Sequence, residues 1–179
     1  MKKTYTLNVA GLTRELPMYE VNDKLDIAAF ILFGDVELTE KTAEELVKIC
    51  PEHDIVITAE AKSIALCHEV AKLSCKDYVI ARKGEKIYMT DPISVTVKSI
   101  TTEYKQKLYL GQEDLKKLKG KRVLIVDDVI STGDSLLALE ELVRKAGGNV
   151  VGKAAVLAEG EAADRDDIIF LEKLPLFFK

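Results

Sequence analysis

The chain has 179 residues, which is enough for one domain with a substantial core and short of two. Hydrophobic residues make up 47% of it and charged residues 31%, the balance of an ordinary globular protein. The net charge of −4 gives no electrostatic reason to expect binding to nucleic acid or to an anionic membrane.

No apolar run is long enough for a signal peptide or for a membrane span. The three cysteines, Cys50, Cys67 and Cys75, have no metal-ligand spacing and cannot all pair with one another. We therefore expect buried, reduced thiols in a cytoplasmic protein, folded as a single domain over residues 1–179.

The first half of the sequence predicts a strand, a helix and then a β-α-β unit. Residues 4–9 alternate apolar and polar side chains, as a strand does, and from Asp35 the apolar residues recur on one helix face. The apolar run 54–59 suits a buried strand. A helix over 64–73 and a strand over 78–81 complete the unit, whose strands should be parallel with a right-handed crossover.

The second half predicts an antiparallel insertion and another β-α-β unit. Two β-rich runs, 93–100 and 106–110, could form a hairpin. They are followed by a core strand over 122–126, a helix over 133–146 and a strand over 150–157. This order indicates an α/β fold with a doubly wound, mostly parallel sheet and a β-hairpin insertion.

The stretch 122–136, RVLIVDDVISTGDSL, carries the strongest chemical signal. Its apolar strand runs into Asp127 and Asp128, and Ser131–Ser135 then opens a helix. Ligands of open α/β sheets bind beyond the carboxyl ends of the strands, and the free N–H groups and dipole at a helix N-terminus favour an anion. Gly133 would let a phosphate approach the backbone closely. The two acids can accept hydrogen bonds from vicinal hydroxyls or hold a cation, so a sugar phosphate would satisfy both halves of the stretch.

Three other interpretations fit this stretch less well. Two acids after a strand are by themselves more often solvated capping residues, but the helix start that follows argues against this. A response-regulator receiver also begins with a strand that ends in two acids, but it needs about 100 further residues, and too few follow Asp128. The Gly-x-x-x-x-Gly-Lys string of a nucleotide-binding P-loop does not occur.

The segment 123–135, VLIVDDVISTGDS, resembles almost position for position the phosphoribosyl pyrophosphate motif of type I phosphoribosyltransferases. The resemblance implies the fold of that family, with Mg²⁺ held by Asp127 and Asp128 directly or through water. It departs from the family pattern at Asp134, where many members carry a second glycine, so this side chain would have to point away from the phosphate. The residues implied for ribose 5-phosphate are Asp127, Asp128, Val129, Ile130, Ser131, Thr132, Gly133, Asp134 and Ser135.

Two earlier segments resemble the pyrophosphate-binding parts of the same family. Residues 58–63, TAEAKS, look like the loop of the purine enzymes that contacts pyrophosphate, with Lys62 where adenine enzymes usually have arginine. Arg82 and Lys83 resemble a second pair that holds the diphosphate. Each basic group taken alone would be read as surface charge. The pyrophosphate residues implied by the resemblance are Ala61, Lys62, Arg82 and Lys83.

The segment 101–106, TTEYKQ, is similar to the mobile loop of adenine and xanthine phosphoribosyltransferases. In that comparison Glu103 and Tyr104 form an acid–aromatic pair that closes over the reacting centre, although Tyr104 could also belong to a plain hairpin turn. The implied reaction displaces pyrophosphate from the ribose anomeric carbon by a purine nitrogen. Glu103 would accept or relay a proton and Asp127 would orient the ribose, so Glu103, Tyr104 and Asp127 are the expected catalytic residues.

The resemblance implies that a small hood, from about 1–34 and 158–179, recognises the base. Xanthine enzymes carry lysine near the position of Glu159, and an acid suits an amino-purine donor better, so adenine is favoured. Xanthine, hypoxanthine and guanine remain alternatives. So does a non-catalytic protein that senses phosphoribosyl pyrophosphate, although the first fifty or so residues contain no basic recognition helix. A homodimer is implied by the resemblance only.

Overall fold

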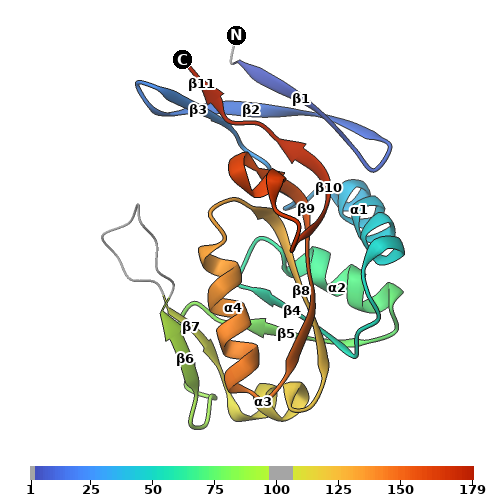
Figure 1. The fold of residues 1–179 in the computed structure, drawn as a ribbon, viewed down its shortest axis with the longest axis vertical. Helices are drawn as coiled ribbons and strands as arrows, with labels where there is room; N and C mark the ends of the chain where they lie inside the picture. Colours follow the sequence, from blue (N-terminus) through green and yellow to red (C-terminus); the bar gives the residue numbers. More distant parts are fainter. Residues whose placement is uncertain (1–2, 97–106) are drawn as a thin grey trace.

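The computed structural model describes residues 3–96 and 107–179, whose centre is a five-stranded parallel sheet (Figure 1). The strand order is β10-β9-β8-β4-β5, and each neighbouring pair is parallel. The predicted α/β class is therefore confirmed. The strands are β4 (Ile55–Ala59), β5 (Asp77–Ala81), β8 (Arg122–Ile130), β9 (Asn149–Glu159) and β10 (Ile169–Leu174).

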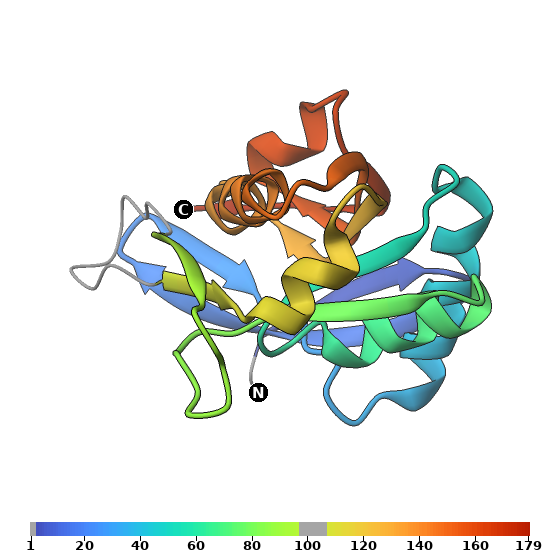
Figure 2. The same cartoon turned by 90° about the horizontal axis from the view of Figure 1, so that it is seen from below.

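Helices cover both faces of this sheet. Helices α1 (Val36–Ile49) and α2 (Ile64–Leu73) lie on one face, and α4 (Asp134–Lys145) lies on the other (Figure 2). From the centre of the sheet, the β4–α2–β5 and β8–α4–β9 units step in opposite directions. Right-handed crossovers that step in opposite directions place their helices on opposite faces. The doubly wound arrangement expected from the sequence is confirmed.

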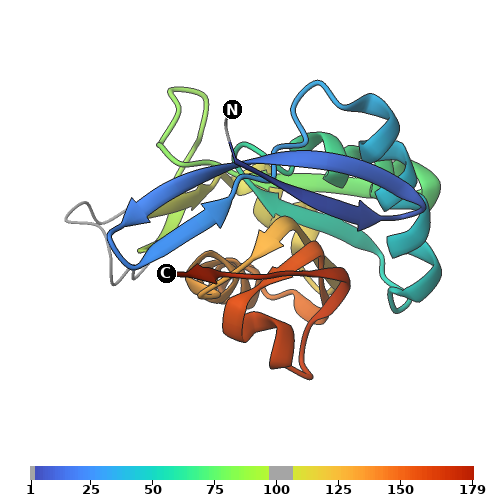
Figure 3. The same cartoon turned by 90° about the horizontal axis from the view of Figure 1, so that it is seen from above.

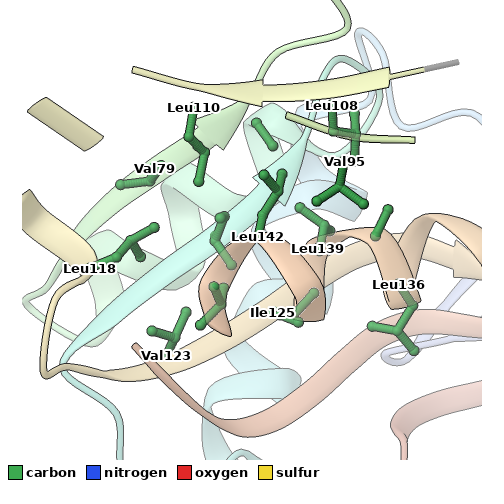
Figure 4. Packing of buried hydrophobic residues seen from close by; sticks show 14 of the residues in the cluster. Val79, Val95, Leu108, Leu110, Leu118, Val123, Ile125, Leu136, Leu139 and Leu142 are labelled. Atoms are coloured by element: carbon green, nitrogen blue, oxygen red, sulfur yellow. The ribbon is translucent and has the colours of Figure 1, made fainter. Parts of the chain in front are cut away.

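The central strands are buried on both faces, which explains their continuous apolar runs. In β8, Val123 and Ile125 belong to the cluster under α4, whereas Leu124 and Val126 belong to the cluster under α1 and α2. Figure 4 shows the first cluster, in which Leu139 and Leu142 of α4 approach Ile125. A rigid sheet thus supports the loops at its carboxyl end.

The antiparallel insertion consists of β6 (Ile93–Thr96) and β7 (Lys107–Leu110), with Ile93 opposite Leu110. The predicted hairpin pairing is confirmed for these residues. Its connection, with Glu103 and Tyr104, lies outside the described residues. A short helix that the sequence did not predict, α3 (Gln112–Leu118), leads from β7 to β8.

A second, antiparallel sheet lies beyond the end of the parallel sheet at which β8 leads into α4 (Figure 1). Its order is β1-β2-β3-β11, which brings the two ends of the chain into one sheet (Figure 3). The strand expected over 4–9 is confirmed, but the three other strands were not predicted. The strands are β1 (Thr4–Val9), β2 (Leu12–Asn22), β3 (Leu25–Ala28) and β11 (Phe177–Phe178).

Two details differ from the sequence predictions. The strand expected to end at Val126 continues to Ile130, because Val129 and Ile130 still pair with β9. Cys75 is exposed rather than buried, since it lies in the surface connection after α2 with a φ of 55°. No helix in the described part of the chain combines the length and the apolar character needed to cross a membrane.

Candidate functional site

Those predicted site residues that the structure describes lie at the carboxyl end of the parallel sheet, around the point where the sheet changes direction. Strand β4 leads to β5 on one side and β8 leads to β9 on the other, so the switch lies between β4 and β8. These two strands pair only from Ile55–Ile57 to Val123–Ile125 and then separate. Crevices of this kind, beyond the carboxyl ends of parallel strands, are where open α/β sheets bind ligands.

Ser63, just before α2, connects the loop after β4 to the two acids of β8. Its Oγ donates to Oδ1 of Asp127 at 2.5 Å and accepts from the backbone N–H of Asp128 at 2.9 Å. Ser63 and Asp128 are only 1% and 2% exposed. Ser63 was not among the predicted site residues, although it stands in the segment that resembles the pyrophosphate loop. The buried serine holds two predicted ligand loops together.

The two adjacent carboxylates affect one another electrostatically. Burial, and next the charge of Asp128, raise the pKa of Asp127, while the hydrogen bond from Ser63 acts in the opposite direction. Nζ of Lys62 lies 3.0 Å from Oδ2 of Asp128. That oxygen is buried and accepts no aligned hydrogen bond from the described residues, so its contact with Lys62 is an ion pair without hydrogen-bond geometry. Lys62 therefore reduces the repulsion at the acids.

The loop after β4 also contacts the basic pair after β5. The carboxylate of Glu60 lies 3.2 Å from Nη2 of Arg82 and accepts from the backbone N–H of Lys83 at 2.9 Å. The pKa of Glu60 is lowered, first by the Lys83 N–H and then by Arg82. The peptide between Glu60 and Ala61 is cis, and Ala61 is exposed at the turn. Glu60 therefore fixes Arg82 beside the predicted pyrophosphate loop, a contact that the sequence did not reveal.

The predicted phosphate loop lies at the start of α4. Gly133 is buried with a φ of 82°, a left-handed conformation that favours glycine. Ser131 and Ser135 are exposed. The hydroxyl of Thr132 donates to Oδ2 of Asp134 at 2.8 Å, so the unusual acid of this loop is held by the loop itself.

Two predicted phosphate residues, Val129 and Ile130, lie in β8 rather than in the loop. Ile130 is buried, so its side chain packs in the core. Val129 packs against the core on the other side. Neither side chain has a hydrogen-bond donor, so any hydrogen bond from these residues to a phosphate would come from their backbone groups.

Glu159 lies at the same end of the sheet, as the last residue of β9. Burial raises the pKa of its carboxyl group, and the charge of Lys62 opposes this effect. A 3-10 helix, η1 (Gly160–Asp164), follows immediately. The predicted base residue thus lies close enough to the predicted pyrophosphate lysine for the charge of Lys62 to affect its pKa.

The acids fit a Mg²⁺ ion only as part of a larger ligand set. Among the described residues no group of three or more His, Cys, Asp or Glu side chains could hold a metal. Mg²⁺ commonly keeps several waters and takes one or two carboxylates together with substrate phosphates. Asp127 and Asp128 supply such a pair of oxygen ligands, and Oδ2 of Asp128 is a buried oxygen without a hydrogen bond.

The arrangement defines a class of binding site. A helix N-terminus and two acids form one half, and two basic loops form the other, so the site suits a ligand with hydroxyl groups between two anionic groups. The sequence model of the phosphoribosyl transferase domain family matches residues 37–175, and the chain belongs to this family. The resemblance seen in residues 123–135 is thereby confirmed.

Relatives with two different base specificities match at similar levels. The adenine phosphoribosyltransferase of Rhodococcus jostii is 32% identical over 145 residues, covering 81% of this chain and 78% of the relative. The hypoxanthine/guanine phosphoribosyltransferase of Methanotorris igneus is 37% identical over 108 residues, covering 60% of this chain and 55% of the relative. A solved adenine phosphoribosyltransferase from Thermoanaerobacter pseudethanolicus has a TM-score of 0.68 at 24% identity, covering 79% of this chain and 84% of that one, which shows the shared fold.

Proposed function

We propose that the chain is a purine phosphoribosyltransferase that uses adenine. It would transfer the 5-phosphoribosyl group from phosphoribosyl pyrophosphate to adenine, giving the nucleoside monophosphate and pyrophosphate. The observation that carries the proposal is the network in which Ser63 joins Asp127 and Asp128 at the switch point of the sheet. It lies between the helix N-terminus of α4 and the basic loops after β4 and β5.

Each half of the site would hold one part of the substrate. The ribose hydroxyls would donate to Asp127 and Asp128, and the 5′-phosphate would accept from the N–H groups at the start of α4. Lys62, Arg82, Lys83 and the Ala61 backbone would hold the diphosphate. Mg²⁺ bound at Asp127 and Asp128 would neutralise charge on the phosphate oxygens.

Substrate binding would exchange ion pairs rather than create them. Lys62 pairs with Asp128, and Arg82 pairs with Glu60. An arriving diphosphate competes for both cations, and as the bond to the ribose breaks, the growing negative charge strengthens these contacts. Closure by Glu103 and Tyr104, with Glu103 moving a proton at the base, stays a prediction.

Glu159 is the proposed base-specificity residue. As a carboxylate it would accept a hydrogen bond from the amino group of adenine. The raised pKa of Glu159 also gives specific support to a second candidate, since a protonated carboxyl group could donate to the exocyclic carbonyl oxygen of hypoxanthine or guanine. The relatives of both kinds support the purine class without choosing between these bases.

The remaining parts of the proposal concern the setting of the site. Residues from about 1–34 and 158–179, which include the antiparallel sheet of β1, β2, β3 and β11, would form the hood over the base within one domain. The active form would be a homodimer in the cytoplasm.

Product formation from phosphoribosyl pyrophosphate, Mg²⁺ and a panel of purines tests the proposal. We expect the largest kcat/KM for adenine, and Glu159→Gln should lower it. A larger kcat/KM for hypoxanthine or guanine than for adenine would favour the second candidate, an enzyme that uses one of those two bases. No turnover with any base, together with tight binding of phosphoribosyl pyrophosphate, would show a sensing protein instead of an enzyme.

A further inference from the structure

The guanidinium of Arg165 lies at the N-terminus of α4, where the helix dipole disfavours a cation. Arg165 follows η1, and its Nη1 would lie 2.6 Å from a Cβ built on Gly133. Gly133 is the residue directly before the first turn of α4. The guanidinium of a residue far along the chain therefore covers the backbone of the phosphate loop.

An ion-pair network fixes the guanidinium in this place. Nε and Nη2 of Arg165 donate to the two carboxylate oxygens of Asp167 at 2.8 and 2.7 Å. Asp167 also accepts from Nζ of Lys153 at 2.6 Å, and Lys153 pairs with Glu140 of α4 at 2.9 Å. The two cations hold the pKa of the Asp167 carboxyl group well below its ordinary value. The arginine is thus attached to β9 and α4 through its neighbours.

Because Nε and Nη2 both donate to Asp167, Nη1 is left for another partner. In the part of the chain that the structure describes, Nη1 makes no hydrogen bond, while it faces the loop of Gly133. A cation at a helix N-terminus is opposed by the partial positive charge of the helix dipole. An anion at that point would interact favourably with both the dipole and the guanidinium.

We infer that Arg165 is a positioning residue for the 5′-phosphate of the substrate. The inference rests on the proposed function, because it assigns a second donor to the phosphate half of that site. Arg165 lies far from the diphosphate residues in the sequence and belongs to the segment after β9. It would make the site select sugars that carry a 5′-phosphate over those that do not.

Binding of ribose 5-phosphate, measured by calorimetry, tests this role. Arg165→Gln removes the positive charge. Arg165→Lys keeps the charge but loses the several donors of the guanidinium group. The matched control is Arg144→Gln, which changes an exposed arginine in the last turn of the same helix. We expect Arg165→Gln to weaken ribose 5-phosphate about 10- to 100-fold, the effect of one charge-assisted hydrogen bond. Arg165→Lys should recover part of this loss, while pyrophosphate binding and the control stay unchanged.

A purely structural arginine gives a different result. Arg165→Gln would then lower the melting temperature but bind ribose 5-phosphate like the unchanged protein, which would overturn the inference. If Arg165→Gln does not fold, an unchanged affinity in Arg165→Lys and in Asp167→Asn overturns it equally. Failure of the unchanged protein to convert any purine, while Arg165→Gln still weakens ribose 5-phosphate, would contradict the proposed reaction and leave the phosphate contact supported.

Discussion

The hydroxyl of Ser63 lies between two acids that would otherwise only repel one another. It donates to Asp127 and accepts from the backbone of Asp128, so one small side chain sets the position of both. Each acid must also be free to accept from a sugar hydroxyl on its outer side. The orientation of the carboxylates is therefore as important to the proposed site as their charge.

Ser63→Ala should lower kcat/KM for phosphoribosyl pyrophosphate about tenfold. The reason is the loss of a buried hydrogen bond to a charged group, worth about 1.5–3 kcal/mol, part of which water recovers. Steady-state kinetics measure this, and Ser63→Thr, which keeps the hydroxyl, should restore most of the activity. Ser74→Ala is the control, because that hydroxyl at the other end of α2 has no hydrogen bond among the described residues. Equal kinetics in Ser63→Ala and Ser74→Ala would contradict the role.

The double change Asp127→Asn and Asp128→Asn should abolish ribose 5-phosphate binding without unfolding the chain. Burial, and next the charge of Asp128, raise the pKa of Asp127 in the folded state. The folded chain therefore holds this proton more tightly than the unfolded chain, and it loses stability as the pH rises above the ordinary pKa of an aspartate. Removing the charges should therefore give a melting temperature at pH 8 that is no lower than that of the unchanged protein. Calorimetry and thermal unfolding check the two parts. Undiminished binding by the double variant would show that the acids do not hold the sugar.

At the scale of elements, the sequence predicted those parts whose signal is local. The apolar runs of β4 and β8, the helical spacing of α1 and the start and end signals of α4 are such signals, and the contiguous loop at the start of α4 is another. The true end of β8 was missed, because the apolar run stops at Val126 while pairing with β9 continues. Strand β2 was missed because Pro17 and charged residues interrupt its alternation. Contacts such as those of Ser63, Glu60 and Arg165 join distant segments, so only the folded chain reveals them.

Gly133→Ala should destabilise the start of α4 more than a comparable change elsewhere. Alanine at a φ of 82° is strained by about 1 kcal/mol, and its Cβ would also displace Nη1 of Arg165. Gly120→Ala is the matched control, since Gly120 has a φ of 72° but nothing within 4 Å of the added Cβ. The melting temperature should fall by about 2–4 °C for each kcal/mol of destabilisation. It should fall further for Gly133→Ala than for Gly120→Ala. Equal drops would mean that Arg165 moves aside without cost.

Asp54 links the amino ends of β4 and β8 and should make stability depend on pH. Its carboxylate accepts from the backbone N–H of Arg122 at 2.8 Å and from Nη2 at 2.9 Å. Arg122, through its side chain and then its N–H, lowers the pKa of Asp54 from 3.8 to about 2. A lowered folded pKa stabilises the fold above about pH 4, and this contribution is lost as the pH falls toward 2.

Asp54→Asn should therefore lower the melting temperature at pH 7 but not at pH 2. Thermal unfolding across this range measures the difference, and it should close between pH 4 and pH 2. The control is Asp23→Asn, in the exposed turn between β2 and β3, because its side chain makes no ion pair or hydrogen bond among the described residues. A gap for Asp54→Asn that is the same at both pH values would show that the ion pair contributes no pH dependence.

For the whole molecule, one apolar surface suggests how two copies would meet. A hollow of about 620 Å³ lies between the segment before α1 and helix α2, and it reaches Ala61 of the pyrophosphate loop. Phe33 and Val36 on its rim are 59% and 67% exposed. Contiguous exposed apolar surface of this kind marks interaction sites, and a second copy would cover it next to the reacting centre.

Phe33→Glu should convert the proposed homodimer to a monomer and raise KM for phosphoribosyl pyrophosphate. The charge would be buried without a partner in the interface, and the pyrophosphate loop would lose its support from the second copy. Sedimentation velocity at several concentrations measures the state, and steady-state kinetics measure KM. Leu137→Glu, an equally exposed leucine on α4, should leave the dimer intact. If the unchanged protein stays monomeric at every concentration, the chain forms no such dimer. If Phe33→Glu stays dimeric, the two copies meet at another surface than the apolar hollow beside the site.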